Sequence, residues 1–140
     1  MIVLDTNVLS ELMEAEPSPP VRAWIDRQDP GNIWTTAVTV YEVFLGIELM
    51  KSGRKRKALE DAMFQLMTRP LKDRVLPFGD AAAGAAAALT ARRKRAGRPI
   101  AVADAQIAGI VETSSATLVT RDVRDFWGMA FPVINPWEAA

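Results

Sequence analysis

The first seven residues, MIVLDTN (residues 1–7), contain three consecutive aliphatic residues followed at once by a carboxylate. A short apolar run such as Ile2, Val3 and Leu4 is typical of a strand buried on both faces of a sheet. The spacing of apolar residues after it predicts a helix over residues 7–14. Asp5 is therefore expected at the carboxyl end of a buried strand, just before a helix begins.

The same alternation of short apolar runs and helical patterns continues along all 140 residues. Further strands are expected at 33–36, 75–78, 117–120 and 132–134, and further helices from Pro20 onward and at 39–50, 54–68, 80–96 and 100–113. Strands separated by helices favour a parallel sheet with right-handed crossovers. The sequence predicts a single α/β domain over residues 1–140, a three-layer sandwich whose mostly parallel central sheet of four to five strands is flanked by helices.

The composition restricts the available chemistry. There are no cysteines and no histidines, which excludes disulfides, thiolate nucleophiles and imidazole ligands or bases. A metal site in this chain must consist of oxygen ligands, and such ligands favour Mg²⁺ or Mn²⁺ over zinc or copper.

Four acidic residues stand at positions that need an explanation: Asp5, Glu42, Asp104 and Asp122. Each has a separate structural explanation. Asp5 and Asp122 follow strands and are suited to cap a helix or turn, Thr39 and Glu42 have the spacing of a capping box, and Asp104 suits the first turn of a helix.

The predicted fold brings these four acids to one edge. Asp5 and Asp122 end strands, while Glu42 and Asp104 lie in expected first helical turns that point at the same side of the sheet, where parallel α/β sheets bind ligands. Two carboxylates about 4 Å apart repel by about 4 kcal/mol at an effective dielectric near 20, so such a cluster must bind protons or a cation. Mg²⁺ is the neutraliser that this composition predicts.

Six stretches resemble one known family in order and spacing. They resemble VapC-type PIN-domain toxins, in particular the FitB-like branch, and they are LDTNVLSEL, TTAVTVYEVFLGIELM, RVLPF, GRPIAVADAQIAG, TLVTRDVRDF and VINPW. The resemblance spans nearly the whole chain and implies a Mg²⁺- or Mn²⁺-dependent ribonuclease. It also implies a homodimer and a cognate antitoxin that inhibits the enzyme and binds operator DNA.

The resemblance implies that the same four acids are the catalytic and metal-binding residues. Asp5 and Asp104 would hold the principal ion, and Glu42 and Asp122 would complete a second site or orient the water that a metal activates for hydrolysis of RNA. Many relatives have Asn in place of Asp122 and an acid at the position of Asp125, whereas this chain has both acids. Asp122 is the preferred site residue because it is nearer the strand end.

The supporting residues are expected to be Asn7, Thr120 and Asp125, which would position the site carboxylates. Two basic clusters, at 51–57 and 92–98, are candidates for phosphate contacts, although basic residues near a helix end also favour a solvated face. The second cluster is preferred because it precedes the Asp104 helix. Without the four site acids the remainder of the chain carries a charge of +4, which favours RNA once a metal is bound.

Other functions and the location were also weighed. No apolar run is long enough for a signal peptide or a membrane span, so the expected location is cytoplasmic. The alternatives are a catalytically idle module that binds antitoxin or RNA, a metal-free ribonuclease, and a haloacid-dehalogenase-type phosphatase, whose second acid is replaced here by Asn7. The apolar helices at 39–50 and 54–68 are expected to be core, or else dimer and antitoxin surfaces.

Overall fold

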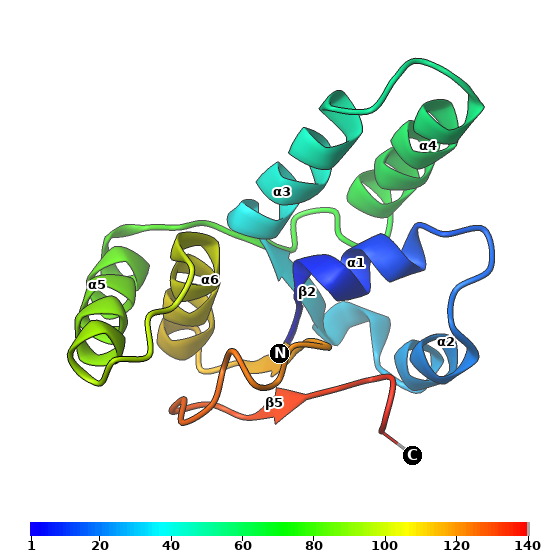
Figure 1. Ribbon diagram of the computed structural model, residues 1–140. Helices are drawn as coiled ribbons and strands as arrows, with labels where there is room; N and C mark the ends of the chain where they lie inside the picture. Colours follow the sequence, from blue (N-terminus) through cyan, green and yellow to red (C-terminus); the bar gives the residue numbers. More distant parts are fainter. Residues whose placement is uncertain (140) are drawn as a thin grey trace.

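The computed structural model describes residues 1–139, which form a parallel sheet covered by helices on both faces (Figure 1). All the predicted strands and helices are present, and their ends differ from the expected ones by only a few residues. In chain order the elements are β1 (Ile2–Leu4), α1 (Thr6–Leu12), α2 (Pro19–Asp26), a 3₁₀ turn (Pro30–Asn32), β2 (Ile33–Thr36), α3 (Ala37–Glu48), α4 (Arg54–Thr68), β3 (Val75–Leu76), α5 (Asp80–Arg95), α6 (Val102–Thr113), β4 (Thr117–Val119) and β5 (Val133–Ile134).

The five strands have the order β3-β2-β1-β4-β5, and every neighbouring pair is parallel. β1 is the central strand and is fully covered, which explains why its sequence is apolar without alternation. Successive side chains of β1 still point to opposite faces, because Ile2 and Leu4 pack with α1, α2, α3 and α4, whereas Val3 packs with α5 and α6. The predicted three-layer α/β architecture is confirmed.

The layer formed by α5 and α6 depends on small residues. Gly109 of α6 lies so close to α5 that a Cβ atom at this position would clash with the carbonyl oxygen of Ala82 and press against Ala86. The alanine-rich sequence of α5 therefore lets two helix backbones approach closely. In Figure 1 this pair stands apart from α1 and α2, on the other side of the sheet.

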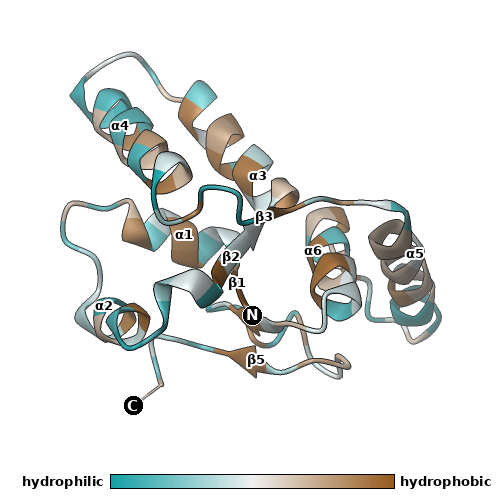
Figure 2. Ribbon diagram, turned by 180° about the vertical axis from the view of Figure 1, so that it is seen from behind, coloured by the Kyte–Doolittle hydropathy of each residue, from teal (hydrophilic) through white to brown (hydrophobic). Residues whose placement is uncertain are grey.

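β1 at the centre of the sheet is hydrophobic, and the edge strand β5 is likewise coloured brown in Figure 2. No helix within residues 1–139 is long and apolar enough to cross a membrane. The chain continues from each parallel strand at the same edge of the sheet, and this edge carries the acidic residues.

Candidate active site

Asp5 is a buried carboxylate at the carboxyl end of β1, with only 4% of its surface exposed. The parallel pairing of Leu4 with Val119 places Asp5 beside the residue that follows β4, which is Thr120. One oxygen, Oδ1, accepts a hydrogen bond from the backbone N–H of Thr6 (2.8 Å), as expected of a residue that caps α1. The other oxygen, Oδ2, accepts from the Thr120 hydroxyl (2.6 Å), so Asp5 both caps the helix and faces the neighbouring strand end.

Asn7 connects Asp122 to this pair. Its side-chain N–H group donates to Asp122 Oδ2 (3.0 Å) and to Thr120 Oγ1 (3.3 Å), and its carbonyl oxygen accepts from the backbone N–H of Arg121 (3.1 Å). The Asp122 side chain therefore contacts α1 rather than the turn that follows it. Two of the three expected supporting residues therefore contact site acids: Asn7 donates to Asp122 and Thr120 donates to Asp5.

Glu42 lies in the second turn of α3, not in the first, so the predicted capping box is wrong. The helix begins at Ala37, three residues after Trp34, and is capped by Thr36, whose hydroxyl accepts from the backbone N–H of Thr39 (3.0 Å). The sequence contains two threonines that could start the helix, and the cap nearer the strand end is the one used. Freed from capping, the Glu42 carboxylate faces α1.

Thr6 holds the Glu42 carboxylate and was missed in the sequence. Its hydroxyl donates to Glu42 Oε1 (2.6 Å) and lies 3.3 Å from the hydroxyl of Thr39, which is fully buried. Thr6 thus connects Asp5, through its backbone, with Glu42, through its side chain. The only signal in the sequence was a hydroxyl residue directly after the acid that ends the strand.

Asp104 is in the first turn of α6 and Asp125 is in the turn after β4, and both line the same cleft. Burial and, to a smaller extent, the charges of the neighbouring acids together raise the pKa of Asp104 to about 6; these acids are, in order of effect, Asp5, Asp125, Glu42 and Asp122. All four predicted site acids and Asp125 therefore share one electrostatic environment. Asp122 and Asp125 were both candidates for the fourth site acid. Asp122 accepts a hydrogen bond from Asn7, two residues after Asp5, whereas Asp125 lines the same cleft as Asp104.

Burial is also the main cause that raises the pKa of Asp5. The hydrogen bonds from Thr120 and Thr6 act in the opposite direction, and the charges of Glu42 and Asp122 add to the rise. Within residues 1–139, none of the ion pairs involves any of these five acids. Their mutual repulsion is therefore not relieved by a lysine or an arginine.

The donor set fits a hard divalent cation by its chemistry. Every candidate ligand is a carboxylate oxygen, and two of the acids have raised pKa values, chiefly through burial and in smaller part through the charges of the neighbouring acids. In the described part of the chain no three acids are spaced closely enough to form a ready ion cage. Like charges repel unless a cation lies between them, so Asp5, Asp104, Glu42 and Asp122 could hold Mg²⁺ or Mn²⁺ only after their side chains move closer together.

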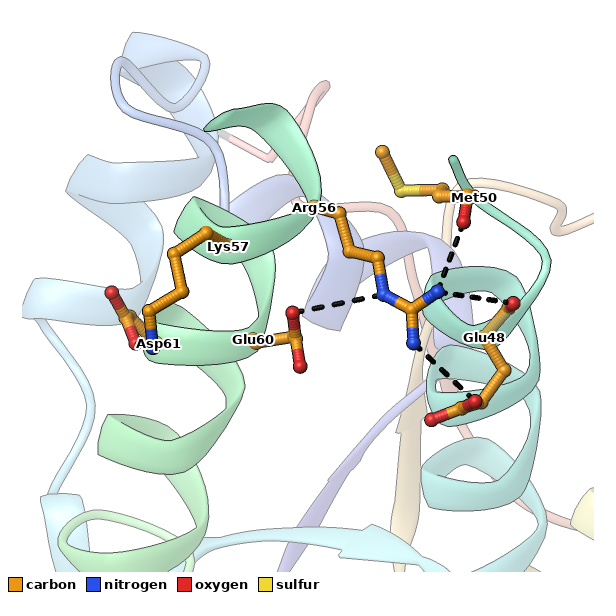
Figure 3. A network of polar contacts seen from close by, with 6 residues as sticks. All are labelled: Glu48, Met50, Arg56, Lys57, Glu60 and Asp61. Carbon is orange, nitrogen blue, oxygen red and sulfur yellow. Dashed lines mark hydrogen bonds and ion pairs between the residues drawn. The ribbon is translucent and has the colours of Figure 1, made fainter. Parts of the chain in front are cut away.

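The first basic cluster, at 51–57, is largely used within the fold. Arg56 bridges α4 and the end of α3 by donating to the carbonyl oxygen of Met50 (3.0 Å) and pairing with Glu48 (3.4 Å) and Glu60 (3.6 Å), as Figure 3 shows. Lys57 pairs with Asp61 on the same helix at 3.0 Å. These cations are already neutralised, which leaves them poorly suited to hold phosphate.

The second basic cluster borders a cleft of about 620 Å³ that also contains Asp104 and Asp125. Arg93 and Arg98 line this cleft, joined by Arg124 from the turn after β4, which the sequence had not indicated. None of these three arginines forms an ion pair with an acid within residues 1–139. The cleft thus combines free cations with the acids of the candidate site.

The fold agrees with that of known proteins. Residues 2–131 match the PIN domain family. The chain is 39% identical to VapC ribonuclease Y4jK of Sinorhizobium fredii over 140 residues, the whole of both chains, and 36% identical to Toxin FitB of Neisseria gonorrhoeae over 99% of both chains. The chain therefore belongs to the PIN domain family, as its motifs predicted.

Solved structures give the same result. The structure of FitAB bound to the IR36 DNA fragment matches with a TM-score of 0.90 at 36% identity, covering 100% of this chain and 98% of the other. The crystal structure of FitAcB from Neisseria gonorrhoeae matches with a TM-score of 0.89 at 35% identity, covering 99% of this chain and 100% of that one. Membership of this family argues against the haloacid-dehalogenase-type phosphatase.

Proposed function

We propose that this protein is a metal-dependent endoribonuclease and the toxin of a type II toxin–antitoxin pair. The observation that carries the proposal is the group of five acids without basic partners at the carboxyl edge of the sheet, next to a cleft lined by free arginines. Relatives of the same length are named a ribonuclease and a toxin, and related solved structures contain DNA-bound FitAB. Arginines can bind the phosphates of RNA, and acids that hold a metal ion can supply the cleavage chemistry.

The chain's own residues have distinct tasks in this proposal. Asp5 and Asp104 would hold the principal ion, with Glu42 and Asp122 as further ligands or as groups that orient the attacking water. A bound Mg²⁺ or Mn²⁺ would supply activation of water and stabilisation of the phosphodiester oxygens.

The neighbouring polar residues fix these carboxylates in place. Thr120 and the backbone of Thr6 hold the two oxygens of Asp5 in fixed directions, and the Thr6 hydroxyl does the same for Glu42. Asn7 ties Asp122 to the end of β1, on which Asp5 lies. Asp125 lines the same cleft as Asp104, and its negative charge contributes to the raised pKa of Asp104.

The test is cleavage by the purified chain, free of any antitoxin, on single-stranded and structured RNA with Mg²⁺, Mn²⁺ or EDTA. We expect cleavage only with a metal, and Asp5→Asn and Asp104→Asn should each reduce it by about 100-fold or more, since one lost ligand removes several kcal/mol of transition-state stabilisation. Glu112→Gln is the matched control, because Glu112 is an exposed acid at the other end of the helix that carries Asp104.

Each other outcome supports a different function. Cleavage that persists in EDTA or in Asp5→Asn would contradict the proposal and favour the metal-free ribonuclease. A protein that binds RNA but cleaves under none of these conditions would be the catalytically idle module. Loss of activity in Glu112→Gln as well would show that the acids act only through overall charge.

The proposal includes a protein partner. The helices predicted to be core or interface expose several large apolar side chains on α3 and α4, namely Tyr41, Phe44, Leu45, Leu49 and Phe64. Exposed apolar clusters of this kind favour binding to another protein, and we propose that they serve the antitoxin and a homodimer, with operator DNA bound through the antitoxin. Light scattering of the chain alone and in complex with a co-expressed candidate antitoxin tests both assemblies.

A further inference from the structure

The cleft beside Asp104 contains an aromatic side chain that the proposed chemistry does not use. Trp127 is 66% exposed although tryptophan is usually at least partly buried. The guanidinium of Arg98 lies over its ring, with Cζ at 4.9 Å from the ring centroid. Both residues line the same cleft as Asp104. An exposed indole covered by a cation is an arrangement on which nucleic-acid bases stack.

The position of Trp127 is fixed by its backbone. Arg93 donates from one side-chain nitrogen to the carbonyl oxygens of Asp125 (3.0 Å) and Trp127 (2.9 Å), so α5 holds the turn that carries both residues. Gly128 follows with φ of 76°, a left-handed conformation that lets the chain turn away immediately after the tryptophan. The indole is thus presented toward the cleft from a turn with a defined conformation.

The cleft has the size and charge for a nucleotide. Its volume of about 620 Å³ lies within the range of small-ligand sites. Arg98 and Arg124 supply positive charge that no acid neutralises within residues 1–139, and Asp104 places the candidate cleavage site at the same cleft. A paired base cannot stack on a protein side chain without being displaced from its duplex, so the arrangement favours unpaired RNA.

We propose that Trp127 and Arg98 form a base-stacking subsite that holds one unpaired nucleotide of RNA beside the Asp104 carboxylate. This inference rests on the proposed function and names the part of the substrate that the site recognises. Stacking tolerates any base, so the subsite selects single-stranded over double-stranded RNA and not a particular sequence. Arg124 contacts the phosphate next to the stacked base, and Arg98 covers the base or exchanges places with it.

The test measures binding in EDTA, so that cleavage does not interfere. A short fluorescently labelled single-stranded RNA, the same RNA as a duplex and a version with abasic positions are titrated with the protein. We expect Trp127→Ala to weaken binding of the single strand by about 10-fold, since the substitution removes the surface on which one base stacks. Binding of the duplex and of the abasic RNA should be weaker in the wild type and unchanged by this substitution.

Two further variants separate stacking from charge and from folding. Trp127→Phe should restore most of the affinity because an aromatic face remains. Arg98→Ala should weaken binding more than Arg27→Ala, which removes an equal charge from an exposed position directly after α2. Because Trp127 is exposed, its removal should leave the melting temperature unchanged, and this is measured for each variant.

The failures are distinguishable. Equal affinity of the wild type and Trp127→Ala for the single strand would overturn the subsite, as would equal binding of normal and abasic RNA, whether or not the wild type cleaves RNA with Mg²⁺. A wild type that shows the expected stacking but cleaves nothing would instead overturn the nuclease and leave the subsite. Loss of antitoxin binding in Trp127→Ala with unchanged RNA binding would assign the cleft to the protein partner.

Discussion

The interface between α5 and α6 and the carboxyl edge of the sheet are packed in opposite ways. At the interface, neutral small residues let two helices approach until Gly109 has no room for a methyl group. At the edge, five acids lie within one electrostatic environment and form no ion pair with an arginine or lysine among residues 1–139, and two of them have raised pKa values. Close packing in the first region stabilises the fold, whereas electrostatic repulsion and burial of carboxylates in the second region destabilise it.

This difference suggests where the protein gives up stability for function. Burying an uncompensated carboxylate such as Asp5 destabilises the fold, and the hydrogen bonds from Thr120 and Thr6 offset only part of that effect. Close packing of α5 against α6 keeps Asp104, at the start of α6, in position near those charges. Adding volume at the interface should therefore lower the free energy of unfolding, whereas removing a charge at the carboxyl edge should raise it.

The largest expected effect is at the interface. Gly109→Ala places a methyl group against the backbone of Ala82 and against Ala86, so the two helices must separate. We expect the free energy of unfolding to fall by about 3 kcal/mol, at the upper end of the range for overpacked cores. Urea denaturation followed by circular dichroism measures the change.

A glycine of α5 provides the matched control. Gly84 is exposed, and a Cβ atom there would meet no other atom within 4 Å. Gly84→Ala should leave stability unchanged or raise it by about 0.5–1 kcal/mol through better helix propensity. Similar losses in the two variants would contradict the close contact between the helices.

A smaller loss of unfolding free energy is expected at the carboxyl edge when the hydrogen bond from Thr120 to Asp5 is removed. Thr120→Val keeps the shape of a fully buried side chain but removes the donor to Asp5 Oδ2. A hydrogen bond to a charged group contributes about 1.5–3 kcal/mol, so we expect a loss of about 2 kcal/mol. Thr90→Val is the control, since the Thr90 hydroxyl is exposed and bonds only to a carbonyl of its own helix; an equal loss in both would show that Asp5 does not depend on Thr120.

The smallest effect has the opposite sign. Burial and neighbouring acids raise the pKa of Asp104 to about 6, so its ionised form destabilises the folded protein at pH 7. Asp104→Asn removes this negative charge, and the metal-free variant should therefore be more stable than the wild type at pH 7. The expected gain is about 1–2 kcal/mol, because Asp104 is only half-buried and solvent screens part of the repulsion. Thermal unfolding in EDTA measures it.

The pH dependence of this variant follows from the same pKa. Between about pH 4 and about pH 7 the folded protein binds more protons at Asp104 than the unfolded chain, so wild-type stability falls as pH rises through the folded pKa near 6. Asp104→Asn should flatten this fall without removing it, because the pKa of Asp5 is also raised. Mg²⁺ should raise the melting temperature of the wild type more than that of the variant, and an unchanged wild-type melting temperature would contradict a crowded carboxylate site.

The sequence predicted the strands and helices well because their apolar residues form continuous runs in the buried strands and recur at helical spacing in the helices. Ile2, Val3 and Leu4 form a continuous apolar run only because both faces of β1 are covered. Local rules failed at the start of α3, where the choice between Thr36 and Thr39 as the cap depends on where β2 ends. The position of Glu42 in the site depends on that choice.

By itself the sequence determined the chemistry available to this protein: an all-oxygen donor set, a parallel sheet with Asp5 at its carboxyl edge, and the family motifs. These follow from residue types and from periods of two and 3.6, which are local properties. Only the tertiary structure decided which polar groups meet, because the Thr6–Glu42 and Asp5–Thr120 contacts join residues 36 and 115 positions apart. It likewise decided that Lys55, Arg56 and Lys57 of the 51–57 cluster form ion pairs, while Arg98 and Arg124 in the cleft form none within residues 1–139.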